Sequence, residues 1–269
     1  MKQGDVIVIT GASSGIGLAC ARLFFKQGFR LVLAARSLDV LKKVQIELDP
    51  QGENVVVVQA DVSIDSDCKK IIDQARLSFG TIHVLINNAG ITMRALFRDV
   101  ELSVMHKIID VNFWGTVHCT HYALPELLKN KGSVVGMSSV AGYKGLPTRS
   151  GYSASKFALE GFLETLRIEN LKTGLHVLIA RPGFTATNIR NTMMDARGQS
   201  QGSSHKDEAR SMTPEMVAEG ILRSLRKRKN YMLMSTTAIL TFWMNKFFSK
   251  WVDRLVFKHV QQEKDSPLK

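Results

Sequence analysis

The chain has 269 residues, of which 45% are apolar, and it carries a formal net charge of +12. This length and composition support a sizeable buried core and exclude a globally disordered chain. The cysteines are few and scattered, and the seven histidines show no ligand spacing. We therefore expect no disulfide framework and no metal site.

The first predicted strand begins almost at Met1, which leaves no room for a signal peptide. No run of about 20 apolar residues predicts a spanning helix. Together with the unpaired cysteines, these features lead us to expect a cytoplasmic protein.

Short apolar strands alternate with longer helical patterns along the chain. Such strands, buried on both faces and separated by helices, are typical of a doubly wound parallel sheet. We predict a single α/β domain over residues 1–231, with helices on both faces of the sheet. The predicted strands are 6–10, 31–34, 55–59, 83–86, 133–137 and 176–180, and the predicted helices are 16–28, one ending near 48, 67–79, 103–129 and 152–173.

The first strand ends in the glycine-rich sequence Thr10-Gly11-Ala12-Ser13-Ser14-Gly15-Ile16-Gly17. Glycines permit a tight turn and the close approach of a phosphate, and the following helix offers its free N–H groups to an anion. We expect a dinucleotide pyrophosphate to be held by Gly11, Ser13, Ser14, Gly15, Ile16 and Gly17. A strand-to-helix turn without a ligand also uses glycines, so this motif alone leaves both readings open.

Tyr152 and Lys156 are four residues apart and share one face of a predicted helix. An ammonium beside a phenol favours the phenolate, so Lys156 is expected to lower the pKa of Tyr152. Ser139 and Ser138 lie thirteen and twelve residues before Tyr152, and they are competing choices for a hydroxyl beside the phenol. Taken alone, the four-residue spacing of Tyr152 and Lys156 also fits a solvated helix face.

These motifs together resemble the classical short-chain dehydrogenase/reductase family, in its NADP(H)-preferring branch. The glycine turn, Asn87-Asn88-Ala89-Gly90, Ser139, Tyr152-x-x-x-Lys156 and Pro182-Gly183 occur in the family's order. The resemblance implies a Rossmann-type fold and hydride transfer between a nicotinamide and a carbonyl or secondary alcohol.

The resemblance also implies roles for individual residues. Tyr152 would be the general acid/base, Lys156 would additionally hold the nicotinamide ribose, and Ser139 would polarise the carbonyl. Asn112 would sit at a helix kink that holds a relay water, although it could equally be a buried amide satisfied by the backbone. Asn87 would be structural. The further cofactor contacts implied are Asp61 and Val62 at the adenine, Asn88 and Gly90 at the nicotinamide ribose, and Pro182, Gly183, Thr185 and Thr187 near the nicotinamide or pyrophosphate.

The cofactor preference rests on the end of the second strand, which reads Ala34-Ala35-Arg36-Ser37. A carboxylate there would accept hydrogen bonds from a ribose 2′-hydroxyl, whereas a guanidinium binds a 2′-phosphate. Arg36 therefore favours NADP(H). An exposed arginine without a ligand is the alternative.

Three loops are expected beyond the carboxyl ends of the strands, at 91–94, 140–150 and 184–211. Their apolar residues either line a substrate pocket or belong to the core beneath the loops. The polar stretch 196–211 is predicted to be a mobile loop that could serve as a lid. The candidate lining residues are Met93, Tyr143, Leu146, Phe184, Met193 and Met194.

The segment 232–269 forms a basic C-terminal tail, in which apolar residues recur at helical spacing from Ile239 to Val260. An amphipathic helix of this kind lies on an anionic membrane surface, or docks on its own domain or on a partner subunit. Membrane contact would point to a lipophilic ketone as substrate. The family resemblance implies a homodimer or homotetramer, and no motif accompanies the basic charge to suggest nucleic acid.

Two other functions share these motifs: a non-catalytic NADP(H)-binding sensor or scaffold, and an epimerase or dehydratase. The joint presence of Asn112, Ser139, Tyr152 and Lys156 favours the oxidoreductase over the sensor. The short turn motif and the modest chain length disfavour the epimerase or dehydratase.

Overall fold

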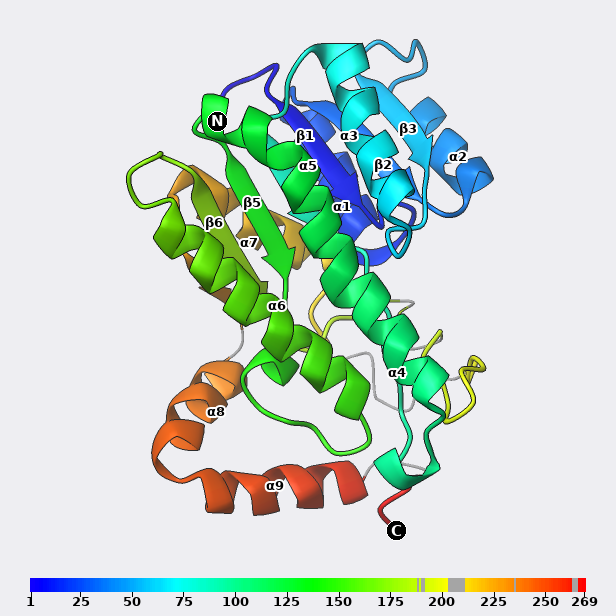
Figure 1. Ribbon diagram of the computed structural model, residues 1–269, viewed down its shortest axis with the longest axis vertical. Coiled ribbons are helices and arrows are strands. Elements are labelled where there is room, and N and C mark those ends of the chain that lie inside the picture. Colours follow the sequence, from blue (N-terminus) through cyan, green and yellow to red (C-terminus); the bar gives the residue numbers. More distant parts are fainter. Residues whose placement is uncertain (188, 190–191, 203–210, 235, 263–265) are drawn as a thin grey trace.

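The computed structural model describes residues 1–187, 189, 192–202, 211–234, 236–262 and 266–269. Its centre is a seven-stranded sheet in the order β3-β2-β1-β4-β5-β6-β7, in which every neighbouring pair is parallel (Figure 1). The strands are β1 (Val6–Thr10), β2 (Arg30–Ala35), β3 (Val55–Gln59), β4 (Val84–Asn87), β5 (Ser133–Met137), β6 (His176–Arg181) and β7 (Tyr231–Leu233).

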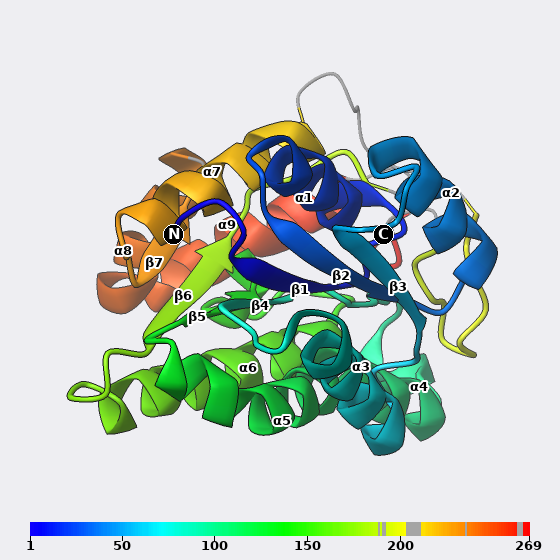
Figure 2. The same cartoon turned by 90° about the horizontal axis from the view of Figure 1, so that it is seen from above.

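Helices cover both faces of the sheet. Figure 2 shows α1, α2 and α7 on one face and α3, α5 and α6 on the other. The predicted doubly wound, Rossmann-type fold is thereby confirmed. The helices are α1 (Gly15–Lys26), α2 (Leu38–Leu48), α3 (Asp65–Phe79), α4 (Leu102–Ile109), α5 (Gly115–Lys129), α6 (Ser150–Glu169), α7 (Pro214–Arg226), α8 (Thr236–Phe247) and α9 (Ser249–Gln261).

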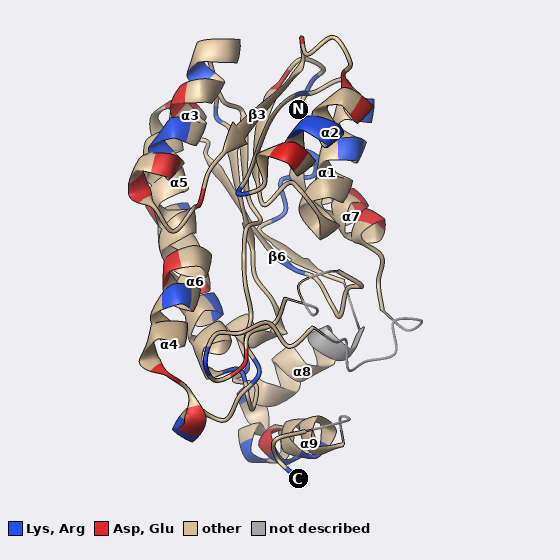
Figure 3. Cartoon of the chain, turned by 90° about the vertical axis from the view of Figure 1, so that its right-hand side faces the viewer, with Lys and Arg blue, Asp and Glu red and all other residues tan. Residues whose placement is uncertain are grey.

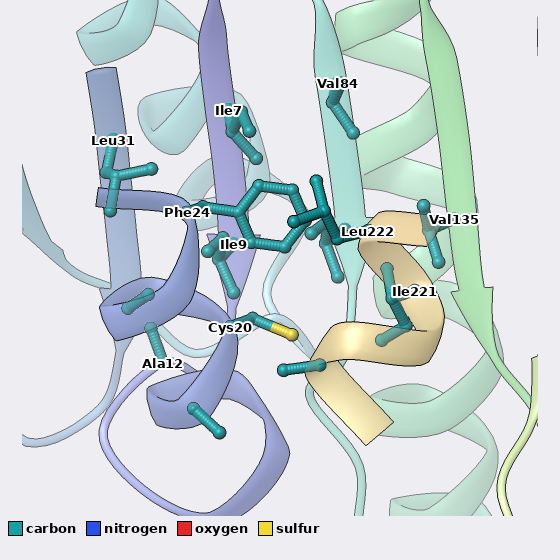
Figure 4. Close-up of a cluster of buried hydrophobic side chains, with 14 of the residues drawn as sticks. Ile7, Ile9, Ala12, Cys20, Phe24, Leu31, Val84, Val135, Ile221 and Leu222 are labelled. Atoms are coloured by element: carbon teal, nitrogen blue, oxygen red, sulfur yellow. The ribbon is translucent and has the colours of Figure 1, made fainter. Parts of the chain in front are cut away.

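The apolar strands divide their side chains between two core layers. On β1, Ile7 and Ile9 join the layer under α1 and α7, whereas Val8 joins the layer on the opposite face. This alternation follows from the two-residue period of a strand, and burial on both faces explains why the strand is continuously apolar. Figure 4 shows the first layer, with Phe24 of α1 and Leu222 of α7 packed over β1.

The chain order reverses between β1 and β4, which are hydrogen-bonded neighbours although two strands separate them in sequence. Ligands of open α/β sheets bind beyond the carboxyl ends of the strands at such a reversal. The glycine turn follows β1, and the sequence Asn87-Asn88-Ala89-Gly90 begins with the last residue of β4. The topology therefore brings these two motifs to the same edge of the sheet.

The structure adds two elements that the sequence patterns did not indicate, α7 and β7. Thr213 caps α7 by accepting a hydrogen bond from the amide of Met216, and Pro214 occupies the first turn. A threonine followed by proline is a helix-start signal, so α7 could have been recognised from the sequence. β7 has only three residues and follows a basic run, which gives it no comparable signal.

The boundaries predicted near the C-terminus need correction. β7 pairs with β6 through Leu233, so the sheet continues past the predicted domain limit at residue 231. The predicted amphipathic helix at 239–260 is two helices, because Phe248 (φ −131°, ψ 48°) interrupts it. Both helices lie beyond the carboxyl ends of the strands, at the bottom of Figure 1.

Candidate active site

The turn after β1 has a backbone that only glycine accommodates readily. Gly11 and Gly15 have positive φ angles of 66° and 54°. A Cβ atom on Gly17 would lie 2.2 Å from the carbonyl oxygen of Gly11. The turn leads directly into α1, and the side chain of the N-cap residue Ser14 makes no capping hydrogen bond. The residues present therefore form a close-fitting, anion-attracting cradle that suits a pyrophosphate.

The loop after β4 is bonded to this turn. The Thr10 hydroxyl oxygen accepts hydrogen bonds from the amides of Asn88 and Ala89, both at 3.1 Å. The Asn88 side-chain Nδ2 donates to the carbonyls of Thr10 and Gly11, at 2.9 and 3.1 Å. Asn88, which we expected at a ribose, thus has its amide group committed to the glycine turn.

Arg36 lies exposed at the end of β2. Gln59 donates to its backbone carbonyl at 3.1 Å, which holds the main chain of Arg36, and no ion pair of its guanidinium is found in the described residues. Asp61, two residues after β3, accepts from the amide and hydroxyl of Ser63 at 3.0 and 2.7 Å.

The reacting groups proposed from the sequence come together. The Ser139 hydroxyl lies near enough to the Tyr152 phenol to act on its pKa, and the Lys156 Nζ lies 5.6 Å from the centre of the Tyr152 ring. Lys156 is buried and donates a 2.7 Å hydrogen bond to the Met137 carbonyl at the end of β5. The helix α6 therefore presents Tyr152 and Lys156 on one face, against the end of β5.

The pKa of Tyr152 is shifted upward, whereas the sequence predicted that Lys156 would lower it. Burial raises the pKa of Tyr152 above its usual value, while the Ser139 hydrogen bond and the charge of Arg149 act to lower it. Burial also lowers the pKa of Lys156 to about 8, against an opposing effect of the Glu160 carboxylate. The net shift at Tyr152 is thus upward, and the cation that opposes it is Arg149, a residue not predicted from the sequence. Arg149 is the N-cap residue of α6 and lies outside the predicted helix 152–173, so no local pattern indicated it.

Ser138 and Ser139, the two competing serines, have different surroundings in the structure. The Ser138 hydroxyl donates to Glu160 at 2.5 Å, and the same carboxylate pairs with the Arg181 guanidinium at 2.9 and 2.5 Å. All three residues are buried. Ser138 is therefore part of a buried polar network, whereas Ser139 faces Tyr152. The buried pair Glu160–Arg181 had no recognisable signal in the sequence.

Asn112 lies in a π-helical segment, Asp110–Trp114, between α4 and α5. Its Oδ1 accepts from the amide of Ile91, and its Nδ2 donates to the carbonyl of Ile91 and to the Ser155 hydroxyl, at 2.8, 2.9 and 3.0 Å. The predicted helix over 103–129 is thus interrupted around Asn112, where the family resemblance implied a kink. The side chain itself is a satisfied buried amide, the alternative left open above.

The side chain of Asn87 is bonded to a helix, since its Nδ2 donates to the Thr120 hydroxyl of α5 at 3.1 Å. Val62 is buried and packs beside Gly115, where a Cβ atom would come within 2.8 Å of the valine side chain. Gly90 faces the reacting groups, because a Cβ atom there would lie 3.3 Å from Asn112 Oδ1 and 3.8 Å from Lys156 Nζ.

The segment after β6 returns to the glycine turn. The Thr187 side chain lies 3.3 Å from where a Cβ on Gly15 would be, and the Thr185 hydroxyl donates to the Gly183 carbonyl at 3.0 Å. Pro182 and Gly183 directly follow β6, at the carboxyl edge of the sheet. All the cofactor residues proposed from the sequence that follow β6 therefore lie at the same edge as the turn.

The apolar loop residues divide between core and surface. Met93, Met193 and Met194 are buried, and Met93 and Met194 pack in one small cluster with Val104 and Ile108. Phe184 is exposed, and Tyr143 and Leu146 are half-buried. The three methionines are thus core residues beneath the loops.

The predicted mobile loop 196–211 is only partly described, since residues 203–210 lie outside the described residues. Its first part is bonded to the body. The Glu101 amide donates to the Ala196 carbonyl at 2.9 Å, and the Gln201 side chain donates to the Arg94 carbonyl at 2.8 Å. Residues 196–202 therefore form an ordered turn packed on the segment 92–101.

Known proteins of one family resemble this chain in sequence. Residues 5–198 match the family model for short chain dehydrogenase. An 11-beta-hydroxysteroid dehydrogenase A from Sesamum indicum is 36% identical over 264 residues, which is 94% of this chain and 76% of the relative. Dehydrogenase/reductase SDR family member 7B from Xenopus laevis is 36% identical over 244 residues, covering 87% of this chain and 74% of the relative.

Solved structures show the same fold. A short chain dehydrogenase/reductase from Burkholderia phymatum in complex with NAD has a TM-score of 0.83 at 25% identity, covering 93% of this chain and 95% of the other. An alcohol dehydrogenase from Thermococcus sibiricus complexed with 5-hydroxy-NADP has a TM-score of 0.75 at 27% identity, covering 86% and 96%.

The chain belongs to the classical short-chain dehydrogenase/reductase family. It is an oxidoreductase that acts on a CH–OH/C=O pair of a small-molecule substrate with a nicotinamide cofactor. Among the helices of the described residues, none has the length and apolar character needed to cross a membrane.

Proposed function

We propose that the protein is an NADP(H)-dependent reductase or dehydrogenase of a lipophilic ketone and its alcohol. The observation that carries the proposal is the Lys156 ammonium 5.6 Å from the Tyr152 ring, with the Ser139 hydroxyl near enough to act on the pKa of that tyrosine. A bound nicotinamide supplies or accepts the hydride.

In the reducing direction, Tyr152 donates its hydroxyl proton to the carbonyl oxygen. Its raised pKa keeps the phenol protonated at neutral pH, which suits a proton donor. Ser139 donates a hydrogen bond to the same oxygen and stabilises the negative charge that develops there. The Lys156 ammonium favours the phenolate as the proton leaves, and it would also hold the ribose hydroxyls of a bound nicotinamide nucleotide.

We retain the relay water at Asn112 as part of the proposal. A π-helical segment leaves main-chain carbonyls outside the regular hydrogen-bond pattern, and such a carbonyl can hold a water. The side chain of Asn112 would anchor that segment through its bonds to Ile91 and Ser155.

The pyrophosphate would rest on the glycine turn, in contact with Gly11, Ser13, Ser14, Gly15, Ile16 and Gly17. Asp61 and Val62 would border the adenine. The nicotinamide half would lie near Asn88, Gly90, Pro182, Gly183, Thr185 and Thr187. The placement of Thr187 beside Gly15 and of Gly90 beside Lys156 supports this arrangement.

The preference for NADP(H) is supported by Arg36, whose guanidinium is exposed at the end of β2, where no carboxylate stands. In the test, kcat/KM is measured with NADPH and NADH for the natural chain and for Arg36→Ala. We expect the natural chain to prefer NADPH and the variant to lose about 10- to 100-fold with NADPH alone. An equal loss with both cofactors would reject the assignment.

The proposal of a lipophilic substrate is supported by the C-terminal tail, residues 232–269. Exposed aromatic and aliphatic side chains gather on α8 and α9, including Phe247 at 73% exposure, and basic residues stand between them. Figure 3 shows these helices at one end of the molecule, with lysines and arginines on α9. This composition suits contact with an anionic membrane surface. The exposed large residues are Leu240, Trp243, Phe247, Phe248, Trp251, Leu255 and Phe257.

Two measurements test this part of the proposal. Turnover is compared across steroids, long-chain ketones and water-soluble ketones with NADPH, and binding is measured by sedimentation with phosphatidylserine-containing and neutral vesicles. We expect lipophilic ketones to be preferred, and the double variant Trp243→Ser/Phe247→Ser to lose vesicle binding while its soluble activity persists. Equal turnover of all ketones together with no vesicle binding would refute it.

We further propose a homodimer or homotetramer. Trp114, Phe157 and Ile168 leave much of their apolar surface exposed on the helical layer that contains α5 and α6. Sedimentation equilibrium of the full chain tests this proposal.

A further inference from the structure

We propose that Lys144 is a positioning residue, and that it holds the Ser139 hydroxyl in place by fastening the catalytic loop to the C-terminal tail. The inference rests on the proposed function, because it assigns Lys144 an effect that passes through Ser139. It gives the tail a role in the chemistry that is separate from any contact with membrane.

Lys144 is a buried lysine, with 9% of its side chain exposed. Its Nζ donates to Asn245 Oδ1 of α8 at 2.9 Å and forms an ion pair with Asp253 of α9. Both partners are about 100 residues away in sequence. One side chain therefore joins the loop between Ser139 and Tyr152 to both helices of the tail.

Two further contacts reinforce this junction. Asn245 Nδ2 donates to the main-chain carbonyl of Tyr143 at 3.2 Å, and the Tyr143 ring packs edge-on against Phe242 with their centres 5.2 Å apart. Asn245 thus accepts from Lys144 and donates to the residue before it. The amide side chain bridges two adjacent residues of the loop, which fixes the loop in orientation as well as in position.

The junction lies one short turn from the proposed active site. Residues Val140–Gly142 form a 3₁₀ turn, and the amides of Tyr143 and Lys144 both donate to the Val140 carbonyl, at 3.2 and 3.0 Å. At the start of the same turn, the Ser139 Oγ accepts from the amide of Ala141 at 3.3 Å. A displacement of Lys144 would therefore act on the turn that orients the Ser139 hydroxyl.

The other side of the turn is held by the buried network of Ser138, Glu160 and Arg181. The Arg181 guanidinium also lies 5.3 Å from the ring centres of both Tyr143 and Phe242. The turn is thus clamped between this network and the tail. Removing the tail-side contacts would leave the turn attached on one side only.

The energetics favour a real constraint at this position. A buried ammonium requires a charged or polar partner, because losing one leaves an uncompensated charge. Asp253 is 62% exposed, so solvent screens its contribution to stability. Lys144 also keeps its hydrogen bond to Asn245 when Asp253 is removed, so the ammonium is not left without a partner. We therefore expect the loss of Asp253 to affect the geometry of the loop more than the stability of the fold.

The test compares Lys144→Met and Asp253→Asn in the full chain, with an NADPH-dependent ketone reduction as the assay. We expect kcat to fall about tenfold in each, with the Kd for NADPH within about twofold, because small displacements of a catalytic group cost rate rather than cofactor affinity. The primary isotope effect with NADPH deuterated at C4 should increase, because the hydride step becomes more rate-limiting. The matched control is Lys69→Met, which removes a lysine from an exposed pair with Asp73 on α3.

A double-mutant cycle with Ser139→Ala separates positioning from general destabilisation. If Lys144 acts through Ser139, Lys144→Met costs little further activity in the Ser139→Ala background. A full tenfold loss in that background, or unchanged kcat in both Lys144→Met and Asp253→Asn, would overturn the inference. If Ser139→Ala alone leaves turnover unchanged, the proposed function fails instead.

Discussion

Ser138 and Glu160 are joined by a 2.5 Å hydrogen bond in which the serine hydroxyl is the donor. This bond places Ser138 in a buried network and leaves its neighbour Ser139 beside Tyr152. Two adjacent serines therefore have separable functions, one in stability and one in the proposed chemistry.

We expect Ser139→Ala to lower kcat by about 10²- to 10³-fold, the usual effect of removing one donor to a developing oxyanion. Ser138→Ala should leave kcat within about threefold and lower the free energy of unfolding by about 1–2 kcal/mol, because it removes one buried hydrogen bond. Steady-state rates and urea unfolding measure the two effects. The assignment would be reversed if Ser138→Ala caused the larger loss of kcat.

The proton-transfer role of Tyr152 predicts opposite pH profiles for the two reaction directions. Burial raises the pKa of Tyr152 above its usual value, so the phenol is protonated through the neutral range. From pH 6 to about 7.5, where Lys156 with its pKa of about 8 stays charged, ketone reduction, which needs the phenol, should be nearly constant. Alcohol oxidation needs the phenolate, and its kcat/KM should rise with pH over the same range without a plateau.

Initial rates in both directions, measured in constant-ionic-strength buffers, test this prediction. Tyr152→Phe should abolish both activities while the Kd for NADPH changes little. A plateau of alcohol oxidation below pH 8 would show that the pKa of the essential base is lowered instead of raised.

The glycine turn predicts a large effect of a small substitution. In Gly17→Ala, the new Cβ would lie 2.2 Å from the Gly11 carbonyl oxygen, so the backbone of the turn has to move. We expect the Kd for NADPH to increase by at least about 100-fold, which corresponds to about 3 kcal/mol. Fluorescence titration with NADPH measures this change.

Gly161→Ala provides the matched control, because a Cβ at that position of α6 meets no atom within 4 Å. Alanine replaces glycine there inside a helix, so we expect an unchanged Kd and a gain in stability of about 0.5–1 kcal/mol. Similar Kd values for the two variants would be incompatible with a phosphate-binding turn at Gly17.

Much of the fold could be predicted from the sequence because its signals are local. The apolar strands and the glycine turn each carry their pattern within a few residues, and the predicted first strand, 6–10, coincides with β1. The spacing of Tyr152 and Lys156 likewise fixes their common helix face. These features depend on chain geometry alone.

The features that the sequence did not reveal depend on contacts between distant segments. The Ser138–Glu160–Arg181 network and the Lys144–Asp253 pair join residues 21 to 109 positions apart. The break at Phe248 lets α8 and α9 each bring a residue to Lys144, a requirement that no local pattern expresses. The upward pKa shift of Tyr152 arises from burial in the folded chain, which the spacing to Lys156 could not show.

The buried ammonium of Lys156 makes a prediction about stability. Burial lowers its pKa to about 8 in the folded protein, from an ordinary value of 10.5 in the unfolded chain. Between these values the unfolded state binds more protons than the folded state, so stability rises as the pH increases from 8 to 10.5. Below pH 8 the fold carries the whole cost of the buried charge, which is about 3 kcal/mol.

Lys156→Met removes that cost together with the hydrogen bond to the Met137 carbonyl, whose loss costs about 1–2 kcal/mol. We therefore expect the variant to be inactive yet more stable than the natural chain at pH 7, with the advantage shrinking as the pH approaches 10. Urea unfolding at several pH values measures the difference, and the exposed Lys172→Met is the control that should show no such trend. If the stability difference between the variant and the natural chain were the same at pH 7 and pH 10, Lys156 would have an ordinary pKa in the folded protein. Burial of the Lys156 ammonium beside Tyr152 would then not lower the stability of the fold.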